Sequence, residues 1–300
     1  MQTINELTYL EKGLTGLAGA SNIDWFSGHF GAAVLAAEFF ISECNLDKNI
    51  VPLVQIQTEK IIERYPHLFK KLGGDEYESK WEDKIISQLQ KNTKNLRNGA
   101  HGVIYGVLAL KALHANNKFA SKEIVNGIVK LLELSSADAF ERYYGIPDYT
   151  IVKVETSDGI PEYKSNVDFI RASFSELNVI YQDETINGKC YFFAGGKIHG
   201  VTHAHAISIL EELGYKELAR GAYENHRLHL KLNRQSPPDP KKINFIRRLF
   251  PHERDYWMRD FNEPHFIKFP YSVLSLLRYL PKEEHNECLH KSSVWWSQNI

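Results

Sequence analysis

The stretch from residue 98 to 117, NGAHGVIYGVLALKALHANN, decides the fold class. After its first turn it consists almost entirely of glycine, alanine and large aliphatic residues, so a helix formed here has almost no polar face. A helix of this kind is stable only when other elements cover it on nearly all sides. The sequence therefore predicts a central helix inside a helical protein.

The neighbouring stretches repeat apolar residues at intervals of three and four, as amphipathic helices do. Clear examples are GAAVLAAEFFISECNL at 31–46 and VPLVQIQTEKIIERYPHLFKKL at 51–72. Two stretches alternate instead about Asp158-Gly159 and Asn187-Gly188, which predicts short β-hairpins near 148–164 and 177–194. We expect an all-α chain, a multi-helix bundle or an α/α toroid-like domain, with residues 1–300 forming one domain that carries the two hairpin insertions.

Composition limits the classes of function. The 300 residues are 43% hydrophobic and 24% charged with a formal net charge of -1, so the global basic field of a nucleic-acid-binding protein is absent. The only cysteines, Cys44, Cys190 and Cys288, are too far apart for a CxxC zinc site and too few for a disulfide framework. The first thirty residues do not resemble a signal peptide, and no stretch has about 18 uninterrupted apolar residues. We expect a cytoplasmic protein without nucleic-acid or membrane partners; its oligomeric state does not follow from the sequence.

A histidine recurs in one setting, after a turn signal and before an apolar helix. The four stretches are SGHFGAAVLAAEF at 27–39, NGAHGVIYGVLAL at 98–110, GKIHGVTHAHAISIL at 196–210 and EPHFIKFPYSVLSLL at 263–277, which hold His29, His101, His199 and His265. The exposed backbone N–H groups of a helix start disfavour an imidazolium ion and attract electron-rich ligand atoms. Four neutral imidazoles at meeting helix ends would line a polar pocket able to transfer protons near pH 7.

Two further features of these stretches have alternative explanations. Glycines beside the histidines, among them Gly28, Gly31 and Gly102, indicate close approach either of a ligand or of a neighbouring helix. His199 and His203 are four residues apart and share a helix face, as paired metal ligands do, but no HExxH motif or carboxylate triad accompanies them. The sequence therefore leaves the metal content open.

The remaining histidines are expected to have structural roles. His205 points away from His199 on an ideal helix, so it is assigned to the other side of that helix. His226 and His229 fit an amphipathic surface helix, although His226 could reach the pocket through Tyr223. Five others are expected to satisfy local hydrogen bonds or to lie at the surface: His67, His114, His252, His285 and His290.

With these motifs in view, the chain resembles the questin oxidase-like family, helical proteins named for an enzyme that opens an anthraquinone ring by Baeyer–Villiger oxidation. IHGVTHAHAISIL is similar to a family pattern at His199, Val201, Thr202 and Ala206. The segments around His29 and His101 also resemble family segments, as does PHFIKFPYSVL at His265 and Lys268. Tyr105 stands where the family has a second histidine, and the chain is shorter than the long family members.

This resemblance implies a helical fold, an oxygenation that uses NADPH, and no visible flavin fingerprint. The sequence itself contains no GxGxxG after a strand and no GxxxxGK[ST], so any dinucleotide would bind in another way. On this basis we expect an enzyme, a monooxygenase-like oxidoreductase of secondary metabolism that acts on a small aromatic or apolar metabolite. The expected catalytic residues are His29, His101, His199, His265 and Tyr105, and the expected substrate-binding residues are Thr202, His203 and Lys268.

Two alternatives remain from the sequence. The same pocket could catalyse an elimination, a cyclisation or a hydrolysis without a redox step. A non-catalytic ligand-binding protein would instead use the glycines for helix packing and the histidines to hold buried water.

Overall fold

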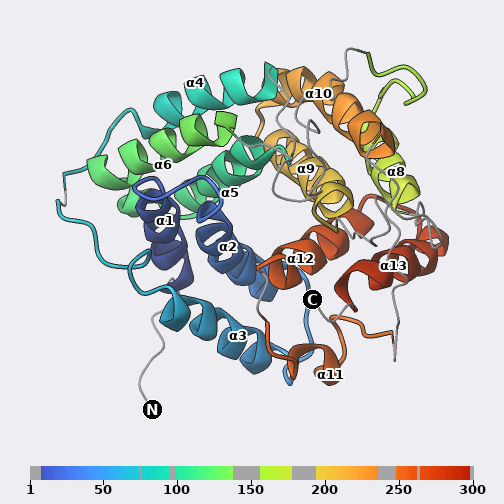
Figure 1. Ribbon diagram of the computed structural model, residues 1–300, viewed down its shortest axis with the longest axis horizontal. Coiled ribbons are helices and arrows are strands. Elements are labelled where there is room, and N and C mark those ends of the chain that lie inside the picture. Colours follow the sequence, from blue (N-terminus) through green and yellow to red (C-terminus); the bar gives the residue numbers. More distant parts are fainter. Residues whose placement is uncertain are drawn as a thin grey trace, which may run out of the picture. The chain divides into compact units, whose positions relative to one another are not determined.

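The computed structural model describes residues 8–74, 76–94, 99–137, 156–177, 194–235, 248–261 and 264–297. Over these residues the chain is helical and has no strand, which confirms the all-α prediction (Figure 1). One isolated antiparallel bridge joins Tyr77 and Ser121. The predicted turn at Asp158-Gly159 exists, since Gly159 has a φ of 85° and Ile160 N–H donates to Ser157 O at 3.0 Å. No strand follows this turn up to residue 164. Residues 148–155 of the first predicted hairpin lie outside the described residues, as do residues 178–193 of the second.

The described residues form two compact units, each built from separate parts of the chain. Unit 1 comprises residues 1–92, 101–137 and 251–271, and unit 2 comprises 93–100, 138–250 and 272–300. Because the segments of the two units alternate along the sequence, no single cut in the chain would separate them.

Unit 1 is organised around two helices that are apolar on almost every side. These are α2 (Gly28–Glu43) and α5 (His101–Ala115), and in α5 all residues except Lys111, His114 and Ala115 are buried. The predicted burial of this helix is therefore confirmed. Both helices pack against each other, and α1 (Thr8–Ala20) and α6 (Lys122–Leu134) cover them. The unit is completed by α3 (Val51–Arg64), most of α4 (Trp81–Lys94), α11 (Arg254–Trp257), and two short 3-10 turns, η1 (Asn117–Phe119) and η2 (Ser135–Ala137).

The glycines of α2 show why α1 and α2 approach so closely. A Cβ atom on Gly31 would lie 2.4 Å from Leu17 N and 2.7 Å from Gly16 C, both backbone atoms of α1. A Cβ on Gly28 would instead meet the ring of Tyr105, at 2.6 Å from Cε2. Of the two explanations for these glycines, the structure supports helix packing at Gly31.

Unit 2 is built on α9 (Ala194–Glu212), which packs against α10 (Lys216–Gln235) and α8 (Asn166–Glu176). The start of α8 is capped by Asp168, whose carboxylate accepts the backbone N–H groups of Lys164 and Ser165, each at 2.8 Å. These two bonds, the one from Lys164 first, lower the pKa of Asp168. The helix α13 (Lys282–Trp296) packs on α8. The helix α12 (His265–Leu277) contributes its first residues to unit 1 and the rest to unit 2.

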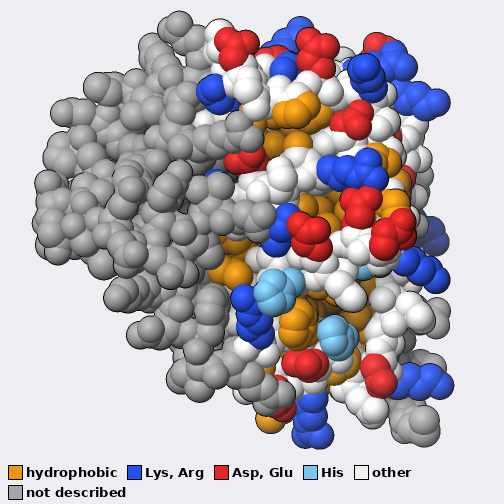
Figure 2. Space-filling view, turned by 90° about the vertical axis from the view of Figure 1, so that its right-hand side faces the viewer, with side chains coloured by type: hydrophobic (Ala, Val, Ile, Leu, Met, Phe, Trp, Pro, Cys, Tyr) orange, Lys and Arg blue, Asp and Glu red, His pale blue; other side chains and the backbone are white. Residues whose placement is uncertain are grey.

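The surface agrees with the nearly neutral composition. On the described part of the face drawn in Figure 2, basic and acidic side chains are mixed, with small apolar areas between them. None of the helices in the described ranges is both long and apolar enough to cross a membrane.

Candidate active site

The centre of the candidate site is His29, the second residue of α2, whose side chain is fully buried. Its Nδ1 lies 2.8 Å from the carbonyl oxygen of Phe26, in the turn that leads into the helix. A carbonyl oxygen can only accept a hydrogen bond, so Nδ1 carries the proton and Nε2 carries the lone pair. The turn before α2 therefore fixes His29 in the tautomer that a general base or a metal ligand needs.

Tyr105 contacts the same nitrogen from α5. Its hydroxyl oxygen is 2.5 Å from His29 Nδ1. Because Nδ1 carries the proton, the phenol oxygen can only accept from it, and the proton of the phenol is then available for a different acceptor. The side chain of Tyr105 therefore touches the central histidine.

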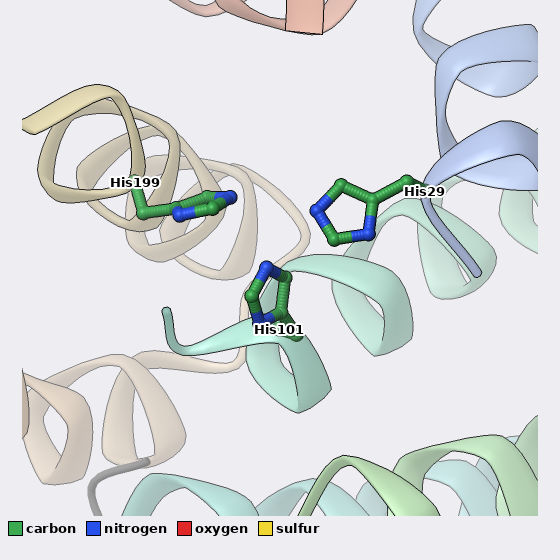
Figure 3. A group of neighbouring side chains, drawn as sticks. All are labelled: His29, His101 and His199. Carbon is green, nitrogen blue, oxygen red and sulfur yellow. The ribbon is translucent and has the colours of Figure 1, made fainter. Parts of the chain in front are cut away.

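Two more histidines surround His29, each at the first residue of a helix. The ring centroid of His101, from α5, is 4.5 Å from that of His29, and the centroid of His265, from α12, is 4.8 Å from it. Figure 3 shows the imidazoles of His29 and His101 turned toward each other from α2 and α5. The three rings are buried. The prediction that these three histidines begin helices is confirmed.

The backbone that leads into α5 is strained. Ala100, directly before His101, has a φ of 53°, in the left-handed region where a residue with a Cβ atom is disfavoured by about 1–2 kcal/mol. Strained residues of this kind persist where the surrounding structure holds them and are common at functional sites. The strain at Ala100 therefore agrees with a functional role for the start of α5.

Aromatic rings and one cation complete this group. Trp25 lies 4.8 Å from the ring of His101, and Phe26 lies 4.6 Å from the ring of His29. Both aromatic residues are partly exposed, whereas the histidines behind them are buried. Lys268, one turn after His265 in α12, is buried with its Nζ 6.0 Å from the centre of the Tyr105 ring.

We call the residues His29, His101, Tyr105, His265 and Lys268 the His29 cluster. It unites five of the eight predicted site residues within unit 1. A metal would be held here by imidazoles, since nitrogen atoms of His29 and His101 lie within 4.8 Å of each other. Neutral imidazole suits borderline ions such as zinc.

The other three predicted residues, His199, Thr202 and His203, lie on α9 in unit 2, and all three are buried. The expectation that His199 begins a helix is wrong, because α9 starts at Ala194 and continues through the glycine pair that suggested a turn. The Thr202 hydroxyl donates to the His199 carbonyl at 3.3 Å, so it bonds to its own helix. His205 pairs with Ser272 Oγ at 3.0 Å, in agreement with a structural role.

His226 and His229 lie on an amphipathic helix, as expected, but on its buried side. Both are buried on the face of α10 that packs against α9, and His229 Nδ1 is 3.2 Å from His203 Nδ1. The ring of His226 lies 5.2 Å from that of His203. Sequence reasoning missed this second histidine cluster, although the spacing of three between His226 and His229 indicates a shared face, one that also includes Ala222 and Leu230.

The protonation of this second cluster follows from its partners. His226 Nε2 donates to Gly200 O at 3.0 Å, so its Nδ1 accepts the Tyr163 hydroxyl at 2.9 Å. The hydroxyl of Ser173, 3.1 Å from Nε2, donates its own proton to Phe169 O, so His226 does not activate this serine as a nucleophile.

Burial sets the charge state here. It lowers the pKa of His226 to about 4 and, together with the neighbouring histidines, places the pKa of His203 well below its usual value. Both rings are therefore neutral near pH 7. His203 Nε2 is buried and has no hydrogen-bond partner among the described residues.

No protein-family model, no curated protein and no solved structure matches the chain.

Proposed function

We propose that the chain is an enzyme in which the His29 cluster performs acid–base catalysis on a small aromatic or apolar metabolite. The observation that carries the proposal is the bond from His29 Nδ1 to Phe26 O, because it leaves the Nε2 lone pair as the site that takes a proton. Among the expected catalytic histidines, the fixed tautomer therefore favours His29 as the base.

The surrounding residues have complementary roles in this proposal. Tyr105 shares the Nδ1 proton and so stabilises the imidazolium that forms when Nε2 accepts a proton from the substrate. His101 and His265 orient the substrate by hydrogen bonds, and the buried ammonium of Lys268 stabilises negative charge on a substrate oxygen. Trp25 and Phe26 supply the apolar contact surface that selects a substrate with a ring.

The resemblance extends this proposal to a particular reaction, the insertion of oxygen beside a ketone carbonyl. In a Baeyer–Villiger oxidation one atom of O₂ enters the bond between the carbonyl carbon and its neighbour, and two electrons and two protons reduce the other atom to water. NADPH would supply the electrons. Lys268 is the one cation of the cluster, which does not match the several phosphate groups of a dinucleotide, so we assign these residues no contact with NADPH.

A second form of the proposal omits the redox step. It is favoured by the chemistry of the cluster, since imidazole and phenol groups are suited to proton transfer. An elimination, a cyclisation or a hydrolysis would use the same His29 base and would proceed without O₂ or NADPH.

The test is turnover of anthraquinones and aromatic ketones by the purified chain and by four variants, His29→Gln, His101→Gln, Tyr105→Phe and His265→Gln. Loss of a general base typically lowers kcat by about 10²–10⁴-fold, and we expect this of His29→Gln. His114→Gln is the matched control, because His114 is an exposed histidine on the same helix as His101.

Product mass and oxygen uptake distinguish the two forms of the reaction. A gain of one oxygen atom that requires O₂ and NADPH supports the oxygenation, and turnover without either supports the non-redox form. Full activity in a folded His29→Gln protein would refute the acid–base proposal, and failure to convert any compound of the panel would contradict the proposed substrate class.

A further inference from the structure

An open pocket of about 560 Å³ lies wholly within unit 2, between the start of α8 and the first turns of α10. These two helices pack against each other and are both visible on the right of Figure 1. The pocket is separate in sequence and composition from the His29 cluster, and none of the expected site residues lines it.

The charges around the pocket favour an anion. Lys164, Lys216 and Arg220 line it, against a single carboxylate from Glu211. The lining itself therefore carries an excess of positive charge. The carboxylate of Asp168 lies beside it, but this group already accepts the backbone N–H groups of Lys164 and Ser165, each at 2.8 Å. Arg220 also pairs with Glu217 at 2.7 Å, but both side chains are highly exposed, and such a pair contributes little free energy. A ligand anion can therefore compete for Arg220.

The one acidic group of the lining is already engaged. The Tyr223 hydroxyl donates to the Glu211 carboxylate. Burial and, after it, this hydrogen bond raise the pKa of Tyr223 far above its usual value, so the phenol keeps its proton. The bond draws the charge of Glu211 toward Tyr223, which reduces its repulsion of an anion in the pocket.

Two tyrosine rings form an apolar corner of the same pocket. The rings of Tyr163 and Tyr223 are 5.9 Å apart at an angle of 75°. Tyr163 is held from behind, because its hydroxyl donates to His226 and His226 in turn donates to Gly200 O. These two hydrogen bonds fix the tautomer of His226, which is not part of the His29 cluster. They also hold the Tyr163 ring in place before a ligand binds.

We propose that this pocket binds a small organic anion in which a planar ring carries a carboxylate or a phosphate group. The ring contacts the corner formed by Tyr163 and Tyr223, and the anionic group lies among Lys164, Lys216 and Arg220. Cationic side chains beside preorganised aromatic rings suit this class of ligand, because the two parts of the ligand meet two different surfaces of one pocket.

The test is a ligand-observed NMR titration of the full chain with four probes: benzoate, phenyl phosphate, inorganic phosphate and benzyl alcohol. We expect the two aromatic anions to bind at least about tenfold more tightly than the neutral alcohol, and phenyl phosphate to bind more tightly than inorganic phosphate. The comparison of benzoate with phenyl phosphate identifies the preferred anionic group.

Substitution locates the site. The double variant Lys216→Gln/Arg220→Gln should bind the aromatic anions about tenfold more weakly, because it removes two exposed charge contacts with the anionic group. Lys282→Gln should bind as the unmodified chain does; Lys282 is an exposed lysine that begins α13, just as Lys216 begins α10. Unchanged binding in the double variant, or equal binding of benzoate and benzyl alcohol, would overturn the proposal.

Discussion

The substitution Gly31→Ala tests whether close packing of α1 against α2 explains a glycine near the candidate base. A methyl group at this position would lie 2.4 Å from Leu17 N, whereas favourable contacts of carbon need about 3.5–4.0 Å. The atoms it meets belong to the backbone of α1, so no rotation of a side chain relieves the contact, and the two helices must move apart by about 1 Å.

The expected magnitude combines two opposed effects. Overpacking a close contact typically costs about 1–3 kcal/mol, and alanine returns about 1 kcal/mol through its higher helix propensity. Because the added methyl meets backbone atoms, the overpacking cost lies at the upper end of that range, and we expect Gly31→Ala to lower the free energy of unfolding by about 2 kcal/mol. Gly221 is the matched control, since it is an exposed glycine inside α10 with no described atom within 4 Å of its added Cβ. Gly221→Ala should raise the free energy of unfolding by about 0.5–1 kcal/mol.

Urea unfolding followed by circular dichroism measures both variants under the same conditions. The two substitutions should shift the midpoint in opposite directions. If Gly31→Ala is as stable as the unmodified chain, α1 does not approach α2 as closely as the structure shows, and the packing explanation for this glycine fails.

Three further predictions concern other parts of the molecule. The pKa of His226 is about 4 in the folded chain and about 6.5 in the unfolded chain, so the unfolded state binds an extra proton between these pH values. The free energy of unfolding should therefore fall by about 3 kcal/mol as the pH drops from 6.5 to 4. Urea unfolding across this range should show a weaker dependence of stability on pH in His226→Gln. Burial raises the pKa of the Cys288 thiol to about 11, whereas Cys44 is partly exposed. Iodoacetamide at pH 8 should therefore label Cys44 well before Cys288, and peptide mass spectrometry measures the two rates. Gln57 donates two hydrogen bonds of 2.8 Å to backbone carbonyls near Trp257, so Gln57→Leu should destabilise the chain by about 2 kcal/mol in thermal unfolding, and no loss would show that these bonds are dispensable.

The local pattern of the sequence was sufficient for the apolar helices and for three helix-start histidines. The stretch that forms α5 has no polar face, so only burial on all sides is compatible with it. A glycine or proline lies one or two residues before each of His29, His101 and His265. These residue types favour turns and helix starts through their own backbone geometry, so the signal is local. At His199 the same reasoning failed, because a glycine pair lowers helix propensity by about 1 kcal/mol per residue without forbidding a helix, and α9 begins before it.

Contacts between distant segments could not be predicted from local sequence patterns. Tyr105 meets His29 across 76 residues, and Tyr163 meets His226 across 63, so neither pair has a local signal. The charged residues of α10 gave it the pattern of a surface helix, but only one face of such a helix is exposed. His226 and His229 lie on the other face, where a neutral imidazole can be buried if its polar atoms are bonded.

The glycines near His29 are required for two different reasons. At Gly31 the neighbouring atoms are backbone atoms of α1, and the absence of a side chain allows two helices to touch. At Gly28 the nearest atoms belong to the ring of Tyr105, whose hydroxyl reaches His29, the next residue in the chain. A side chain at position 28 would displace that ring from the histidine it contacts. The sequence pattern Gly-His at the start of α2 therefore couples the two residues in space: the glycine makes room for the tyrosine, and the tyrosine shares the proton that defines the state of the histidine.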